Sequence, residues 1–259
     1  MYSIQLDLHT HTIYSGHAFS TIGENAAEAA RKGLEAIAMT DHFSPFMTPR
    51  RADGSPDMGP MMNFEALPKT INGVRVLSGV EIDIVDFEGH LAFCDCFPNN
   101  FPGEGGVSIG ERLLRSRDVV IASIHMFPGF RDGSAAQNTD LYIAALQNPY
   151  VDIIGHPCRP GLPFDHTAVA RAAKQLGKCL EINDHSFDMP ESTDNCRALA
   201  IKCAEEGTHI VVSSDAHSAW FVGEFSRAAK MLEEIHFPQE LIANESLDKF
   251  AGVRGKCFK

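Results

Sequence analysis

The chain has 259 residues and a net charge of −12, with 22 lysines and arginines against 34 aspartates and glutamates, and 44% of it is hydrophobic. This composition is typical of a globular domain, and its acidity argues against binding to long nucleic acids but not to a small anion held by metal ions. No apolar run approaches the ~20 residues of a membrane span, and no signal-peptide pattern opens the chain. We therefore expect one cytoplasmic domain over residues 1–259, with no membrane contact and an undetermined oligomeric state.

Seven apolar runs bounded by turn residues predict seven β-strands. In chain order they cover 4–9, 34–42, 74–83, 118–126, 151–157, 179–184 and 209–217. Alanine-rich amphipathic stretches predict helices between most of them, most clearly at 25–33, 166–177 and 195–207, each ending at a glycine. This alternation indicates an α/β fold with parallel strands, either an open doubly wound sheet or a distorted (β/α)7 TIM-like barrel.

Histidines and carboxylates stand at or near the carboxyl-terminal ends of these strands. They are His9, His42, Glu81, His125, His156, Asp215 and His217. In a barrel these ends meet at one mouth, whereas an open sheet would spread them along a crevice, so the pattern favours the barrel. Any one of them is most often a hydrogen-bonded structural residue. This many on one side predict a metal centre, because without metal they would leave poorly compensated polar groups.

Two short spacings strengthen the prediction. Side chains at positions i and i+2 of a strand point the same way, so His9 with His11, and Asp215 with His217, can both face the mouth. Asp7 precedes His9 by two residues and is expected on its face of the strand.

Polar residues close to the ligand candidates could act at the site or have a structural role. Asp7 and Asp41 could accept the second ring N–H of a metal-bound imidazole, and a plain structural hydrogen bond is an equal alternative. Arg159 lies three residues beyond His156, where a guanidinium can bind phosphate through two parallel hydrogen bonds. Arg131 and His185 are weaker candidates for substrate contacts.

The long segment 43–63 is rich in proline, glycine and methionine and carries Arg50 and Arg51. Its length and position suggest a lid over the mouth. The seven cysteines form no regular framework, and they are expected to be reduced thiols.

In order and spacing these residues resemble the PHP family, named for polymerase and histidinol phosphatase domains, and most closely its single-domain bacterial YcdX-type phosphatases. The matching pieces are DLHTH at 7–11, His17, TDH at 40–42, Glu81, His125, His156 and SDAH at 214–217, with EIN at 181–183, DNCR at 194–197 and GEF at 223–225.

The resemblance implies three divalent metal ions, usually zinc, with manganese or iron as chemical alternatives. The first would be held by His9, His11, Glu81 and Asp215, the second by Glu81, His125 and His156, and the third by His17, His42 and His217. A water bridging the metals of Glu81 and Asp215 would then attack a small phosphomonoester as hydroxide, with no protein acid or base assigned.

Other functions remain open at this point. Within the family they are a histidinol-phosphate phosphatase and a nucleotide phosphodiesterase or nuclease. An amidohydrolase fits the ligand order less well, and a non-catalytic PHP module is disfavoured because no expected ligand position is missing.

Overall fold

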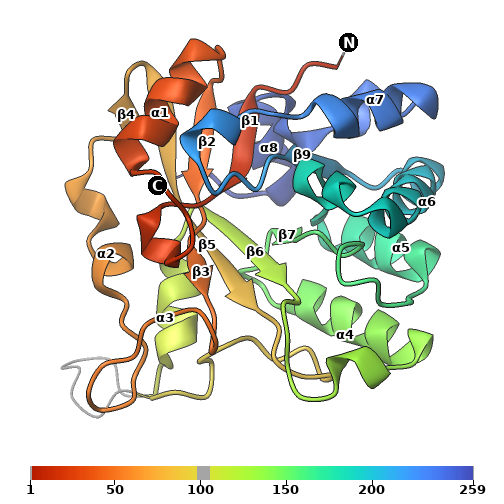
Figure 1. Ribbon diagram of the computed structural model, residues 1–259. Helices are drawn as coiled ribbons and strands as arrows, with labels where there is room; N and C mark the ends of the chain where they lie inside the picture. Colours follow the sequence, from red (N-terminus) through yellow and green to blue (C-terminus); the bar gives the residue numbers. More distant parts are fainter. Residues whose placement is uncertain (1, 98–105, 259) are drawn as a thin grey trace.

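Seven parallel strands form the centre of the computed structural model, which describes residues 2–97 and 106–258 (Figure 1). They lie in the order β1 (Leu6–Thr10), β2 (Ala36–Met39), β5 (Val74–Asp83), β6 (Val119–Ser123), β7 (Ile153–Ile154), β8 (Cys179–Asn183) and β9 (Ile210–Ser213). Two short strands pair with β5, namely β3 (His42–Phe43) in parallel and β4 (Thr70–Ile71) in antiparallel orientation. A parallel bridge between Thr10 and Ala216 joins the first and last strands just past β9, so the sheet is nearly closed into the predicted barrel.

Helices cover the outside of this sheet. They are α1 (Ile22–Arg31), α2 (Gly59–Met62), α3 (Ile109–Ser116), α4 (Ala135–Gln147), α5 (His166–Leu176), α6 (Pro190–Glu206), α7 (Ser226–Glu234) and α8 (Leu247–Arg254). Figure 1 shows α4 to α7 following one another along one outer side. Thr21 and Glu24 form a capping box at the start of α1, and glycines in left-handed conformation end α5 and α6. Each helix within the described residues is too short or too polar to cross a bilayer.

One face of all seven strands packs into a single interior cluster. It includes Leu6, Leu8, Ala36, Ala38, Leu77, Val119, Ile121, Ile153, Cys179 and Val211, and Phe250 of α8 joins it. A cluster that draws alternate residues from every strand is the inside of a barrel. The barrel is therefore filled by side chains below its mouth.

The strand predicted at 74–83 has these bounds in β5, whereas the other strands are shorter than predicted. The run 151–157 contains only the two-residue strand β7, and 209–217 contains β9, which ends at Ser213. The difference has a backbone cause, because His156 and Asp215 have φ angles of 25° and 56°, outside the strand region. The chain leaves the sheet where it presents these side chains.

Candidate metal centre

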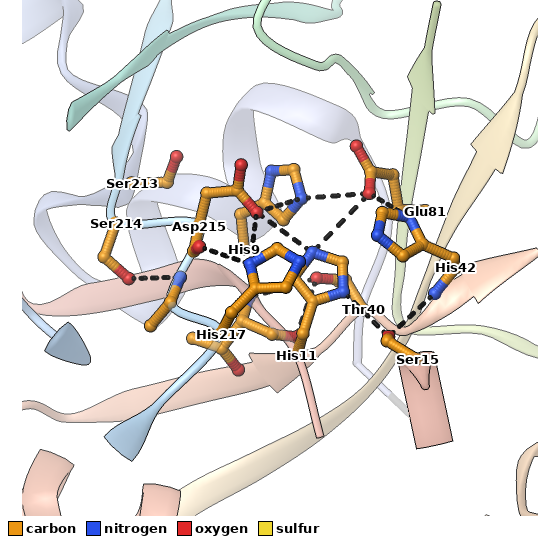
Figure 2. A network of polar contacts seen from close by, with 12 residues as sticks. His9, His11, Ser15, Thr40, His42, Glu81, Ser213, Ser214, Asp215 and His217 are labelled. Atoms are coloured by element: carbon orange, nitrogen blue, oxygen red, sulfur yellow. Dashed lines mark hydrogen bonds and ion pairs between the residues drawn. The ribbon is translucent and has the colours of Figure 1, made fainter. Parts of the chain in front are cut away.

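All nine predicted ligands come together at the carboxyl-terminal mouth of the barrel. Figure 2 shows imidazole rings turned toward the carboxylates of Glu81 and Asp215. The ring of His11 lies 4.3 Å from that of His42 and 4.2 Å from that of His217, centroid to centroid. His17 lies at the exposed edge of the cluster, where its Nε2 atom is 2.9 Å from Nε2 of His217.

The spacing of ligand atoms fits metal coordination. Nε2 of His9 lies 3.3 Å from an oxygen of Glu81 and 3.3 Å from an oxygen of Asp215, and Nε2 of His11 lies 3.0 Å from the same Asp215 oxygen. Atoms held about 2.0–2.1 Å from one zinc ion in a tetrahedron are separated by roughly 3.3–3.4 Å. The side chains are thus spaced like ligands of a shared ion.

Among the described residues, four triplets of side chains within this cluster could each hold an ion. They are His9–His11–Asp215, His9–Glu81–His156, His42–Glu81–His125 and His11–His42–His217. The first lies within the ligand set expected for the first metal. The other three divide the residues differently from the expected sets, so the assignment of ligands to individual ions stays a prediction.

Buried polar atoms support the fit. Nε2 of His9 and of His11, Oε2 of Glu81 and Oδ1 of Asp215 are buried and, within the described part of the chain, make no hydrogen bond. Leaving such atoms unsatisfied costs free energy. A cation placed among these nitrogen and oxygen lone pairs would satisfy them, and imidazole with carboxylate is the donor set that divalent transition metals prefer.

Carboxylates outside the cluster orient its imidazoles. Nδ1 of His9 lies 2.8 Å from Oε1 of the buried Glu181, and Nδ1 of His125 lies 2.8 Å from Oδ1 of the buried Asp83. Such bonds fix which ring nitrogen is free to bind metal. The sequence argument did not assign a role to either acid. For Glu181 the signal was the EIN stretch of the family resemblance, and for Asp83 it was the position two residues beyond Glu81 at the end of the same strand.

The two aspartates that were considered for this role do something else. Asp41 accepts hydrogen bonds from Thr12 and Ser15, and the Ser15 hydroxyl lies 3.0 Å from Nδ1 of His11, so Asp41 reaches a ligand only through a serine. Asp7 accepts from Ser214 and from the backbone N–H of Gly223 at 2.8 Å. It therefore anchors the loop after β9 and does not orient a ring.

The charges of the site keep its two central carboxylates ionised. Burial raises the pKa of Glu81, but His9, His125 and His42 outweigh it and hold that pKa well below its usual range. Burial likewise raises the pKa of Asp215, and His9 and Arg159 hold it well below normal. Both groups are therefore available as anionic ligands.

The predicted substrate contacts differ in their surroundings. Arg159 lies at the centre, where its Nη2 donates to Asp215 and to Asn183 at 2.6 Å each, and its buried Nε has no hydrogen-bond partner among the described residues. Arg131 is exposed and stacks on the ring of Phe130, and among the described residues its guanidinium makes no hydrogen bond or ion pair with the cluster. His185 forms an ion pair with Asp188 at 2.9 Å, and its ring lies 6.5 Å from that of His217.

A pocket of about 320 Å³ opens directly beside the cluster. Its lining includes Asp215 and His217 of the cluster, together with His185, Phe19, Phe221 and the Asp188–Arg227 ion pair. Its size suits a small organic group. Of the three candidate contacts, the structure thus brings Arg159 and His185 to the site and leaves Arg131 outside it.

The segment 43–63 is only partly a free loop. Met58 and Met61 are buried in the hydrophobic core, and the hydroxyl of Tyr14 donates to the carbonyl of Asp57. Arg50 stacks on Phe93, with its guanidinium 4.9 Å from the ring centroid. Residues 49–54 form its exposed tip, and Phe46, Met62 and Asn63 are exposed as well.

Comparisons with known proteins agree with this geometry. Residues 7–185 match the PHP domain. A probable phosphatase of Caldanaerobacter subterraneus subsp. tengcongensis is 44% identical over 246 residues, covering 94% of this chain and 88% of the relative, and one of Acetivibrio thermocellus is 40% identical, covering 95% and 92%. A crystal structure of histidinol phosphate phosphatase from Lactococcus lactis, complexed with zinc, L-histidinol and phosphate, aligns with a TM-score of 0.62 at 20% identity, over 90% of this chain and 94% of that one. The chain belongs to the PHP domain family.

Proposed function

We propose that the protein is a metal-dependent phosphatase that hydrolyses a small phosphomonoester. The observation that carries the proposal is the set of nine imidazole and carboxylate side chains around one mouth, several of which have buried atoms without a hydrogen-bond partner among the described residues. The curated relatives named probable phosphatases support the same activity.

The nine residues would hold three divalent ions, with zinc as the first candidate and manganese or iron as alternatives. Bound ions of this kind lower the pKa of water near neutrality and neutralise charge on phosphoryl oxygens. Glu81 and Asp215 supply the anionic ligands at the centre, while Glu181 and Asp83 hold the rings of His9 and His125 in register.

Arg159 would bind the phosphoryl group. Its charge lies beside Asp215, and its Nε is not engaged by another described residue, which leaves a donor for a phosphoryl oxygen. The pocket beside His217 would then receive the leaving group, with His185 at its wall. No side chain is assigned as a general acid.

The size of the pocket also helps to decide between the alternative substrates. About 320 Å³ accommodates a small leaving group but not a polymer, and the acidic chain repels long nucleic acids. A histidinol-phosphate phosphatase stays the second candidate, because its leaving group is small and the Lactococcus lactis protein shares the fold. We place the protein in the cytoplasm as a single domain.

The test combines metal analysis of the purified protein with turnover of p-nitrophenyl phosphate, each before and after chelation. About three metals per chain and turnover that chelation removes and one added metal restores would support the proposal. Bound metal without turnover of any phosphomonoester in a metabolite panel would contradict the phosphatase activity. A protein that takes up no metal would contradict the metal centre itself.

A further inference from the structure

Two aromatic residues of the pocket beside the metal cluster are largely exposed to solvent. Phe19 and Phe221 line this pocket of about 320 Å³ together with the ligand candidates Asp215 and His217, and they are 80% and 60% exposed. An aromatic ring offers a large apolar area, and exposed apolar side chains that share one cavity indicate a place where an apolar group can bind. The pocket therefore combines apolar surface with direct contact to the metal cluster.

The backbone fixes the places of both aromatic residues at the mouth. The N–H of Phe19 donates to the carbonyl of His217 at 2.8 Å, which ties the loop after β1 to the loop after β9. Phe221 lies four residues beyond His217, in the 3-10 helix Ala219–Phe221. The next residue, Val222, is fully buried in a hydrophobic cluster and anchors this turn. Both aromatic residues are thus held next to a ligand candidate although they are largely exposed themselves.

The acidic side chains of the pocket already have basic partners. Besides the ligand candidate Asp215, the described lining contains three acids, which are Asp184, Asp188 and Glu224. The Nε atom of Arg227 donates to Asp184 at 2.9 Å, and Nη1 of the same guanidinium donates to Asp188. Glu224 forms an ion pair with Lys32. A cationic leaving group would compete with these partners for the carboxylates, whereas an uncharged ring needs no countercharge.

We propose that the leaving group of the substrate is an uncharged aromatic ring that packs against Phe19 and Phe221, which makes these two residues determinants of substrate specificity. The inference rests on the proposed phosphatase function, because it takes the phosphoryl group to be held at the metal cluster. Contacts between aromatic rings are stabilised beyond the area that they bury. A small aliphatic leaving group would cover less of either side chain and would bind more weakly.

The test measures binding separately from turnover by using phosphonates, in which a C–P bond replaces the ester bond. The metal-loaded protein is titrated by calorimetry with benzylphosphonate, methylphosphonate and 2-aminoethylphosphonate, and turnover of benzyl phosphate and p-nitrophenyl phosphate is measured in parallel. The double variant F19A/F221A removes both aromatic rings of the pocket. The matched control F46A/W220A removes two aromatic side chains of residues that are 55% and 80% exposed and lie outside the described lining. Thermal unfolding checks that all three proteins are folded.

We expect the wild type and F46A/W220A to bind benzylphosphonate about fivefold or more tightly than either other phosphonate, and F19A/F221A to show a preference of about twofold or less. The inference is overturned if benzylphosphonate does not bind, if methylphosphonate or the amine binds the wild type equally well or better, or if both double variants keep or both lose the preference. A preference for benzylphosphonate without turnover of any phosphomonoester would contradict the phosphatase function and leave the aromatic pocket standing. Turnover without that preference would contradict the aromatic pocket alone.

Discussion

Replacing Glu181 with glutamine removes the carboxylate that orients His9 while keeping its shape. Oε1 of Glu181 lies 2.8 Å from Nδ1 of His9 and also accepts from the hydroxyl of Ser213, and Oε2 accepts from the backbone N–H of His156 at 2.6 Å. Glutamine has one accepting oxygen and one amide that donates, so it cannot serve all three donors. Either the His9 ring or the His156 backbone then loses its partner.

We expect this substitution to weaken metal binding. Substituting a group that orients a metal-bound histidine typically weakens metal affinity by about 10- to 100-fold, which corresponds to roughly 1.4–2.7 kcal/mol. The metal would still bind, because Glu81 and Asp215 lie within 3.3 Å of Nε2 of His9 and remain as ligands. We therefore expect Glu181→Gln to lose metal at lower chelator concentrations than the wild type, and to lose p-nitrophenyl phosphate turnover in parallel.

The assay is a chelator competition followed by metal analysis, run beside the variant Glu206→Gln. Glu206 is a half-buried residue at the end of α6 that pairs with Arg171 at 2.8 Å, far from the mouth, and its replacement should leave metal affinity unchanged. Thermal unfolding of the metal-free proteins separates weaker metal binding from a weaker fold. Equal chelator sensitivity in Glu181→Gln and the wild type would refute the role given to Glu181.

Four further changes test other parts of the site. His17→Ala should lose about one metal per chain, because His17 contacts the cluster only at its edge, and unchanged stoichiometry by metal analysis would contradict its assignment. Arg159→Lys should lower kcat/KM for p-nitrophenyl phosphate by about 10- to 100-fold with metal content unchanged, since lysine lacks the planar fork; an unchanged kcat/KM would remove Arg159 from phosphate binding. Replacing residues 51–55 with two glycines should change the ranking of substrates in a phosphomonoester panel without loss of metal, whereas loss of metal would mean that the tip is structural. Gly155→Ala should lower the free energy of unfolding in urea by about 1–3 kcal/mol, because the added Cβ would lie 2.1 Å from the Ser123 hydroxyl; equal stability would show that this contact relaxes freely.

Much of the site follows from the order of residues along the chain. Parallel strands present their carboxyl ends at one edge, so polar residues that recur at the ends of apolar runs must meet there. This reasoning places Glu81, His125 and His156 correctly without any knowledge of their distances. Arg131, a weaker candidate, shows a limit of this reasoning: its loop follows a ligand strand, but its side chain, in the 3-10 helix Phe130–Asp132, stacks on Phe130.

Acids that act on the ligands are harder to predict. Glu181 belongs to the EIN stretch of the family resemblance and Asp83 ends β5, but neither position reveals its partner, because the partners are 172 and 42 residues away in the sequence. Asp7 and Asp41 were considered as partners of metal-bound imidazoles only because they lie close to ligand candidates in the sequence. Contacts between strands depend on register, which periodicity does not specify across the barrel.

Strand β1 shows how local irregularity completes the centre. Strict alternation in the run Leu6–Thr10 would place Leu6 and Leu8 on one face and Asp7 and His9 on the other. The two leucines pack inside the barrel, so a regular strand would turn His9 outward. The register against β2 shifts instead, since Asp7 pairs with Ile37 and Thr10 with Met39, which leaves one extra residue in β1. The extra residue accounts for His9 reaching Glu81 and Asp215 while Asp7 stays with the loop after β9. The pattern of apolar and polar residues in LDLHT is that of a regular strand, and it therefore predicts Asp7 on the face of His9, whereas the two side chains bind different partners.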